Sequence, residues 1–93
     1  MKLRLYSVAE EQIASAARWY EEKQSRLGNR FLDAIDEGVL QIVAAPERWP
    51  VLQVAADTGA RYVQVRGFPY VIVYRLEQDE VAVLSVAHTA QLK

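Results

Sequence analysis

The sequence predicts an α+β domain in which a helical hairpin packs on one face of a small, mostly antiparallel sheet. Two helix-periodic segments fill the first half of the chain, three strand-like runs fill residues 61–87, and one short alternating segment comes first. The expected element order is therefore β-α-α-β-β-β. Because 93 residues suffice for a single hydrophobic core, we expect one domain over residues 1–93.

The first helix is expected to follow a short strand. Residues 3–6 (LRLY) alternate in the period-2 manner of a strand. Ser7 lies where an N-cap is wanted, and Glu10 completes a capping box three residues later, so the helix is predicted to begin at about residue 8. Its apolar stripe consists of Ile13, Ala16, Ala17 and Tyr20.

The second helix is predicted to run antiparallel to the first. The first helix should end around residues 25–28 with Gly28 in the turn, and Pro46 stops the second helix. In the first helix, Trp19 and Tyr20 are interpreted as helix-packing residues. The second apolar stripe consists of Phe31, Leu32, Ile35, Val39, Ile42 and Val43. The helix carboxylates, interpreted as solvated, are Glu21, Glu22, Asp33, Asp36 and Glu37.

Three strand-like runs follow a loop at residues 46–60, in which two prolines and an Asp-Thr-Gly signal leave room for one irregular extended piece. Residues 61–66 alternate, residues 70–76 are almost continuously apolar, and residues 81–87 are rich in β-branched side chains. The middle run predicts a central strand buried on both faces. Its face away from the helices is expected to line an open, concave and mostly apolar surface, with Arg75 as its one arginine.

Charge and composition disfavour several classes of function. The chain has 11 basic and 12 acidic residues, a net charge of −1 and a pI of about 5.8, whereas nucleic-acid-binding domains usually have a pI above about 9. We therefore expect no direct nucleic-acid binding. Cysteine is absent, and neither a long apolar run nor a signal peptide is recognised. These features predict a cytoplasmic protein without membrane contact.

An ordered set of motifs resembles the ParE/RelE superfamily of type II toxin–antitoxin toxins, on its ParE-like branch. The motifs are WYEE in the first helix, LGNRFLDAID at the start of the second, FPYVIVYR in the middle strand and SVAH near the end. The resemblance covers essentially the whole chain. It implies a small bacterial toxin held inactive in a hetero-oligomer by a cognate antitoxin, whose extended or helical segment wraps it.

The branches of this superfamily differ in their targets. RelE-like members resemble ribosome-dependent mRNA endonucleases, whose sheet carries Lys and Arg for the scissile phosphate and whose tail carries an aromatic residue. The chain ends at Lys93 without that aromatic residue, and the corresponding sheet positions carry no cation. ParE-like members resemble inhibitors of DNA gyrase that need no catalytic residue. We therefore predict a non-enzymatic gyrase inhibitor, with an mRNA endonuclease as the alternative. The sheet positions at which the RelE-like enzymes carry cations correspond, in this resemblance, to Tyr62, Gln64, Val71 and Thr89.

The tail departs from the family pattern. That pattern commonly runs His-x-x-Arg-x-Pro, whereas residues 88–93 read HTAQLK, so Gln91 stands where the arginine is expected. Either the tail is not essential, or this copy has reduced or lost activity. An inactive homologue that only binds its antitoxin therefore stays open as a further alternative.

Five residues are predicted to contact the antitoxin or the target. Arg61, Arg66 and Arg75 either form a cationic face for acidic partner side chains or are simply solvated. Trp49, between two prolines, is a candidate interface aromatic that would otherwise cap the helical hairpin. His88 is the single histidine and is better explained as a strand-end residue than as an acid–base group. We predict no catalytic residue, metal or cofactor.

Overall fold

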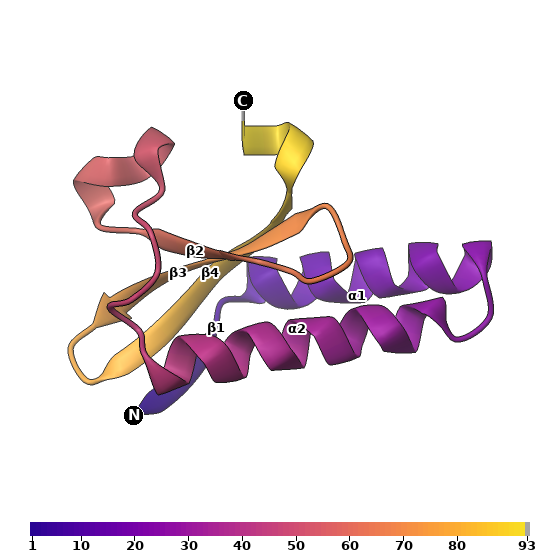
Figure 1. Cartoon of the computed structure of the whole chain (residues 1–93), viewed down its shortest axis with the longest axis horizontal. Helices are drawn as coiled ribbons and strands as arrows, with labels where there is room; N and C mark the ends of the chain where they lie inside the picture. The colour runs from indigo at the N-terminus through magenta and orange to yellow at the C-terminus, as the bar shows by residue number, and fades with distance from the viewer. Residues whose placement is uncertain (93) are drawn as a thin grey trace.

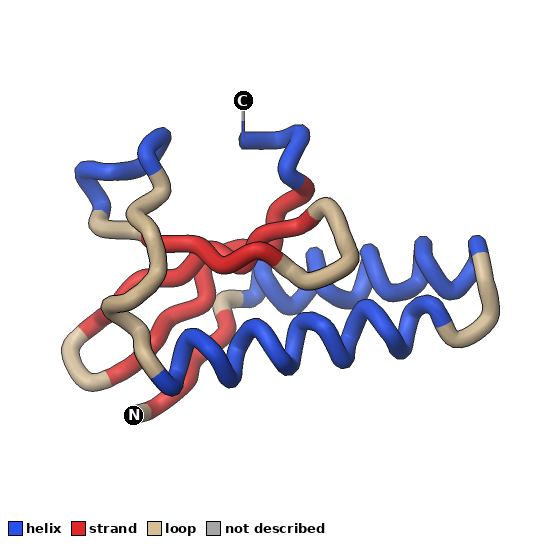
Figure 2. The backbone as a smooth tube through the Cα atoms, viewed as in Figure 1, coloured by secondary structure: helices blue, strands red, loops and turns tan. Residues whose placement is uncertain are grey.

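The computed structural model describes residues 1–92 and confirms the predicted element order (Figure 1). Figure 2 shows α1 and α2 on one side of the sheet, with the two short 3-10 helices η1 and η2 on the other. The elements are β1 (Lys2–Leu5), α1 (Ser7–Lys23), α2 (Leu27–Ala44), η1 (Gln53–Thr58), β2 (Arg61–Gln64), β3 (Tyr70–Glu77), β4 (Glu80–His88) and η2 (Thr89–Leu92).

The sheet has the strand order β1-β4-β3-β2 and is antiparallel except for the β1–β4 pair. The β1–β4 pairing ends at Leu5↔Val83, although β4 continues to His88. Leu84 is an extra residue in the β3–β4 ladder, because Val83 and Ser85 pair with consecutive residues of β3. The second half of β4 therefore lies beyond the reach of β1.

The capping box predicted at Ser7 is wrong. Tyr6 is the N-cap of α1, Ser7 is already helical, and within the described residues no side chain caps this end. The Tyr6 N–H donates to the Val83 carbonyl oxygen at 3.0 Å, so the extended backbone of β1 continues up to the first turn of the helix. Strand pairing, not side-chain capping, therefore sets where α1 begins.

The turn of the helical hairpin also differs from the prediction. It comprises residues 24–26, with Arg26 in the left-handed conformation at a φ of 74°, and Gly28 lies inside the first turn of α2. A Cβ atom added to Gly28 would lie 2.6 Å from the Ala17 carbonyl oxygen. Gly28 is therefore required for the close approach of the two helices, whereas the turn between them does not depend on it.

Glu21 is a structural residue, although its sequence position indicated a solvated one. Its carboxylate accepts a hydrogen bond from the Arg26 N–H at 3.0 Å and another from the Gly28 N–H at 3.1 Å. These donors belong to the N-terminal end of α2, where backbone N–H groups lack helical partners. Glu21 of α1 therefore caps α2 from outside and links the two helices.

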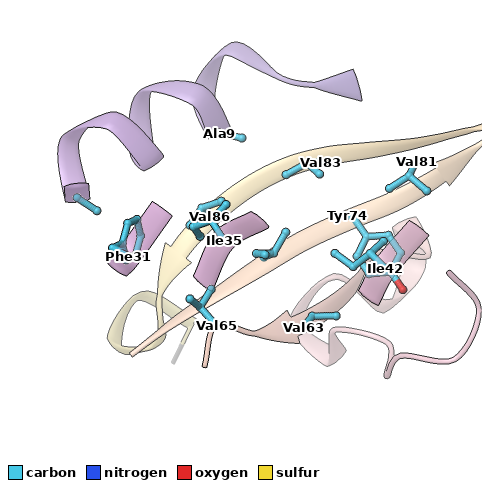
Figure 3. Packing of buried hydrophobic residues seen from close by; sticks show 12 residues of the cluster. Ala9, Phe31, Ile35, Ile42, Val63, Val65, Tyr74, Val81, Val83 and Val86 are labelled. Atoms are coloured by element: carbon cyan, nitrogen blue, oxygen red, sulfur yellow. The ribbon is translucent and has the colours of Figure 1, made fainter. Parts of the chain in front are cut away.

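The main core fills the space between the helical hairpin and the sheet (Figure 3). Phe31 of α2 and Tyr74 of β3 are fully buried, and the Tyr74 hydroxyl donates to the Pro46 carbonyl oxygen. Tyr20 packs against Phe31, Phe68 and Tyr70, as a helix-packing residue should. The prediction that Trp19 also packs inside the fold is wrong, since this side chain is 53% exposed. Consecutive side chains of a helix point about 100° apart, so Trp19 cannot face the core in the direction that Tyr20 does.

The opposite face of the sheet is less open than predicted. β3 is buried on both faces, as expected, and Val71 and Val73 form a second small core with Ala60 and Ala87. Side chains from η1, η2 and the sheet cover this core, which leaves its apolar atoms largely out of water. The covering side chains are Leu52, Ala55, Tyr62, Leu84 and Leu92.

We predict that Gly28→Ala lowers the free energy of unfolding by about 1–2 kcal/mol, since the new methyl group meets a backbone oxygen that cannot rotate away. Gly38→Ala is the matched control. Its Cβ would meet the Ile72 Cδ1 atom at 2.7 Å, the movable end of a side chain, while both substitutions gain helix propensity of about 1 kcal/mol. Urea unfolding measures both, and equal stabilities would contradict the close-approach role of Gly28.

We predict that Glu21→Ala destabilises the fold by about 1–2 kcal/mol, because two N–H groups of α2 lose a charged acceptor. Glu22→Ala removes an equal charge from the exposed neighbouring position and serves as the control. Both are measured by urea unfolding at neutral pH. A Glu21 variant no less stable than the Glu22 variant would show that the external cap contributes nothing.

Candidate protein-binding surfaces

Two of the five predicted contact residues hold the base of the helical hairpin. The Trp49 indole N–H donates to the Gln41 carbonyl oxygen at 3.3 Å, and the side chain packs half-buried against the main core. The Arg61 guanidinium donates to the backbone oxygen of Trp49 itself. Both side chains thus have internal partners, and Trp49 takes the hairpin-capping position that was the alternative to an interface role.

Arg66 lies at the exposed turn between β2 and β3. Its side chain is 85% exposed, and its 3.5 Å contact with Glu37 is a surface ion pair that water screens strongly. Across a shallow hollow beside Phe68 lies a second arginine, Arg30 of α2. These two arginines form an accessible cationic site. The sequence prediction included Arg66 and missed Arg30.

Arg75 lies on the sheet face away from the helices, as predicted, but it is paired. It forms an ion pair with Glu77 two residues along β3, and the Tyr6 hydroxyl donates to the same carboxylate at 3.2 Å. The hydrogen bond from Arg75 lowers the pKa of Glu77, and the same bond raises the pKa of Arg75. The positive charge that Arg75 was predicted to give this face of the sheet is therefore largely neutralised by Glu77.

His88 ends β4 and has structural contacts. Its Nδ1 atom accepts a hydrogen bond from the Ala90 N–H at 3.1 Å, and its ring packs edge-on against Tyr70 with centroids 5.2 Å apart. The backbone N–H of His88 is held by the Gln91 side-chain oxygen at 3.0 Å. The histidine thus fixes the start of the tail, and its ring lines a groove.

That groove, with a volume of about 750 Å³, runs between α1 and the second half of β4. One helix stripe forms a wall: Val8, Gln12, Ser15 and Trp19, spaced by four, three and four residues. Val8 and Trp19 are both more than half exposed. The sequence prediction missed this wall because the stripe mixes apolar and amide side chains and lies next to the more apolar core stripe.

The four positions at which the resemblance led us to look for endonuclease cations lie around a separate hollow. Tyr62, Gln64, Val71 and Thr89 line a space of about 320 Å³ between η1 and η2. The Gln64 amide donates to the backbone oxygens of the β2–β3 turn, and Leu52 and Leu92 complete much of the lining. The described lining contains apolar, hydroxyl and amide groups and no lysine, arginine or histidine.

Over residues 1–92, carboxylates and the histidine do not gather in threes as a metal site would require. None of the helices described combines the length and apolar character needed to span a bilayer.

Comparisons with known proteins place the chain in a family. Residues 3–93 match the family described as ParE toxin of type II toxin-antitoxin system, parDE. The fold is similar to a solved chain described as Chromosomal ParDE TA system from P. aeruginosa, with a TM-score of 0.60 and 18% identity over 95% of both chains. No curated protein matches the sequence. Since the family match spans nearly the whole chain, this protein belongs to the ParE toxins, a family that implies an antitoxin partner.

We predict that Glu77→Gln lowers the free energy of unfolding at neutral pH and not at low pH. A carboxylate whose pKa is lowered on folding stabilises the protein above its unfolded pKa, near 4.3, and loses that effect as pH falls through the folded value. Wild type should therefore exceed the variant in unfolding free energy at pH 7, and the two should converge at low pH. Urea unfolding of both proteins at several values between about pH 2 and pH 7 checks this. A difference in unfolding free energy between wild type and variant that does not change with pH would contradict the pairing of Glu77.

Proposed function

We propose that this ParE-family chain inhibits DNA gyrase through protein–protein contact, without catalysis, and that its cognate antitoxin neutralises it. The observation that carries the proposal is the lining of the hollow at Tyr62, Gln64, Val71 and Thr89. Cleaving RNA by attack of a 2′-hydroxyl requires cations that stabilise charge on the phosphate. The positions that would supply them hold a phenol, an amide, an isopropyl group and a hydroxyl. A gyrase inhibitor would act in the cytoplasm, where its target is.

The nearby arginines do not supply the missing charge. Arg61 is bound to the backbone of Trp49, and Arg75 is paired with Glu77. Moving either one to the hollow would break these bonds and leave a carbonyl or a carboxylate without its partner. The surface is consequently better suited to contact with a protein than to holding a phosphodiester.

Among the five candidate contact residues, Arg66 and His88 are the ones we propose to reach a partner directly. Arg66 offers an exposed guanidinium beside Arg30, which suits a carboxylate-bearing partner surface. His88 lines the groove beside α1. Trp49, Arg61 and Arg75 make internal contacts instead.

The test is supercoiling of relaxed plasmid by purified gyrase in the presence of the purified chain. We expect progressive loss of supercoiling as the chain is added, and restoration when the antitoxin is supplied in equal amount. Arg66→Glu should weaken the inhibition, whereas Arg48→Glu, a charge reversal beside Trp49, should leave it nearly unchanged. Normal supercoiling at saturating chain would overturn the proposal, and mRNA cleavage on translating ribosomes would favour the endonuclease instead.

Gln91 supports a second candidate, an inactive homologue that binds its antitoxin without harming the cell. Its side-chain oxygen is turned back to the His88 N–H, and no positive charge is presented where the family pattern has arginine. Controlled induction of the chain alone in a bacterial host separates the two. Growth arrest supports the gyrase inhibitor, whereas normal growth with folded protein present, and arrest by Gln91→Arg, would favour the inactive homologue.

A further inference from the structure

Positive charge gathers at the tip of the helical hairpin, residues 18–30. This segment contains four basic and two acidic side chains, whereas residues 31–60 contain one basic and five acidic. One of the two acidic side chains at the tip, Glu21, is already engaged with the N–H groups of α2. The tip is therefore a positive surface on a chain whose net charge is −1.

The hollow beside Phe68 brings an arginine of this tip next to one from the sheet. Arg30 of α2 and Arg66 of the β2–β3 turn both line this space, which has a volume of about 470 Å³. The rest of its described lining is aromatic, aliphatic or glycine and includes no carboxylate. The two arginines thus border a space whose walls hold no counter-charge.

Aromatic packing fixes the wall between the two arginines. The ring centroid of Phe68 lies 4.9 Å from that of Tyr20 and 5.1 Å from that of Phe31. Tyr20 belongs to α1 and Phe31 to α2, so the β2–β3 turn is tied to both helices. The backbones that carry Arg30 and Arg66 are therefore held in place before any ligand binds, which lowers the cost of ordering them.

Both guanidinium groups have hydrogen-bonding capacity to spare. Arg30 joins none of the ion pairs formed between described residues. Arg66 has only the 3.5 Å contact with Glu37, and its side chain is 85% exposed. A guanidinium carries five N–H donors in a planar fork that matches the two oxygens of a carboxylate. The pair can therefore take up an acceptor from outside without breaking a strong internal bond.

We propose that this hollow takes one carboxylate side chain of gyrase, an Asp or a Glu, which Arg30 and Arg66 hold together. The inference rests on the proposed inhibition of gyrase and specifies the contact through which the chain holds its target. Guanidinium–carboxylate hydrogen bonds are charge-assisted and directional. Leu27 and Phe68, which line the same hollow, provide apolar contact for the methylene groups of that side chain and keep water from the pair.

The charges next to the hollow favour a protein carboxylate over the phosphates of DNA. Asp33, Asp36 and Glu37 follow Arg30 within about two turns of α2, and all three are exposed. A nucleic-acid backbone repeats its negative charge along its whole length, so it would meet these carboxylates soon after the arginine pair. A single acidic side chain needs the pair alone. The occupant is therefore a discrete carboxylate on a protein surface.

A double-mutant cycle tests whether the two arginines hold one group. Arg30→Ala, Arg66→Ala and the double variant are titrated against purified gyrase, with Arg18→Ala, at an exposed position of α1 outside the hollow, as the control. Each single substitution should weaken binding about tenfold, and the double variant should lose clearly less than the product of the two. Losses that multiply would overturn the shared carboxylate, and unchanged binding would overturn the site.

Lysine variants test the geometry of the contact. Arg30→Lys and Arg66→Lys keep the positive charge and remove the planar fork, so each should bind gyrase several-fold more weakly than wild type. Full affinity in both lysine variants would show that a general positive field is sufficient, and it would overturn the proposed grip on one carboxylate. Urea unfolding of every variant verifies that it is folded, which is expected because both arginines are exposed.

Two further titrations distinguish other occupants of the hollow. Wild type should not bind duplex DNA in the absence of gyrase, and DNA binding that Arg30→Ala abolishes would overturn the proposal in favour of phosphate. Antitoxin, purified as the product of the adjoining reading frame, should bind the double alanine variant as tightly as wild type. Loss of antitoxin affinity with inhibition of gyrase retained would assign the pair to the antitoxin and overturn the proposal.

The failure of this site and the failure of the proposed function give different results. If wild type neither binds gyrase nor inhibits supercoiling, the proposed function fails, and the site fails with it. If wild type inhibits supercoiling and the double variant of Arg30 and Arg66 inhibits equally well, the site alone is overturned. Inhibition by wild type that the double variant loses, with Arg18→Ala unaffected, is the result that the proposal predicts.

Discussion

The departure of the chain from the sheet at Tyr6 is the constraint on which the rest of the structure depends. Tyr6 still donates to β4, and the next residue begins α1, so β1 covers the first part of a nine-residue strand. The helix then has to run beside the remaining part of β4. Residues of α1 thereby cover one side of the main core and also form one wall of a groove at the sheet edge.

Close packing of the helical hairpin keeps that wall in place. Gly28 lets the two helices approach to backbone contact, and Glu21 binds the first turn of α2 from the facing helix. Tyr20 then reaches Phe31 and Phe68, which joins the hairpin tip to the β2–β3 turn. Rigid support of this kind leaves the groove and the arginine pair as surfaces formed before any partner arrives, which lowers the cost of ordering on binding.

Much of the fold could be predicted from apolar periodicity, because the pattern itself reports which face is buried. The run at residues 70–76 indicated a doubly buried strand, and the structure confirms this at Tyr74 and Val73. The roles of Glu21 and Trp19 could not be predicted, because each depends on which element lies opposite. A local pattern is equally consistent with a solvated carboxylate and an external cap.

The candidate surfaces were harder to predict for the same reason. Arg75 was correctly placed on the face away from the helices, but its pairing with Glu77 depends on strand geometry and on Tyr6. The cover that η1 and η2 provide over Val71 arises from segments whose prolines and glycines indicated only a loop. The unpaired edge of β4 could not be predicted from periodicity, because it depends on where β1 leaves the sheet, at Leu5↔Val83.

Amide hydrogen exchange of the free chain tests the central claim most directly, that β1 leaves half of β4 unpaired on one side. The N–H of Ala87 points into the β3 ladder, whereas its neighbours Val86 and His88 rely on side-chain acceptors. The account predicts slow exchange at Ala87 and markedly faster exchange at Val86 and His88. Equally slow exchange at all three residues would contradict it, because the edge would then already be closed.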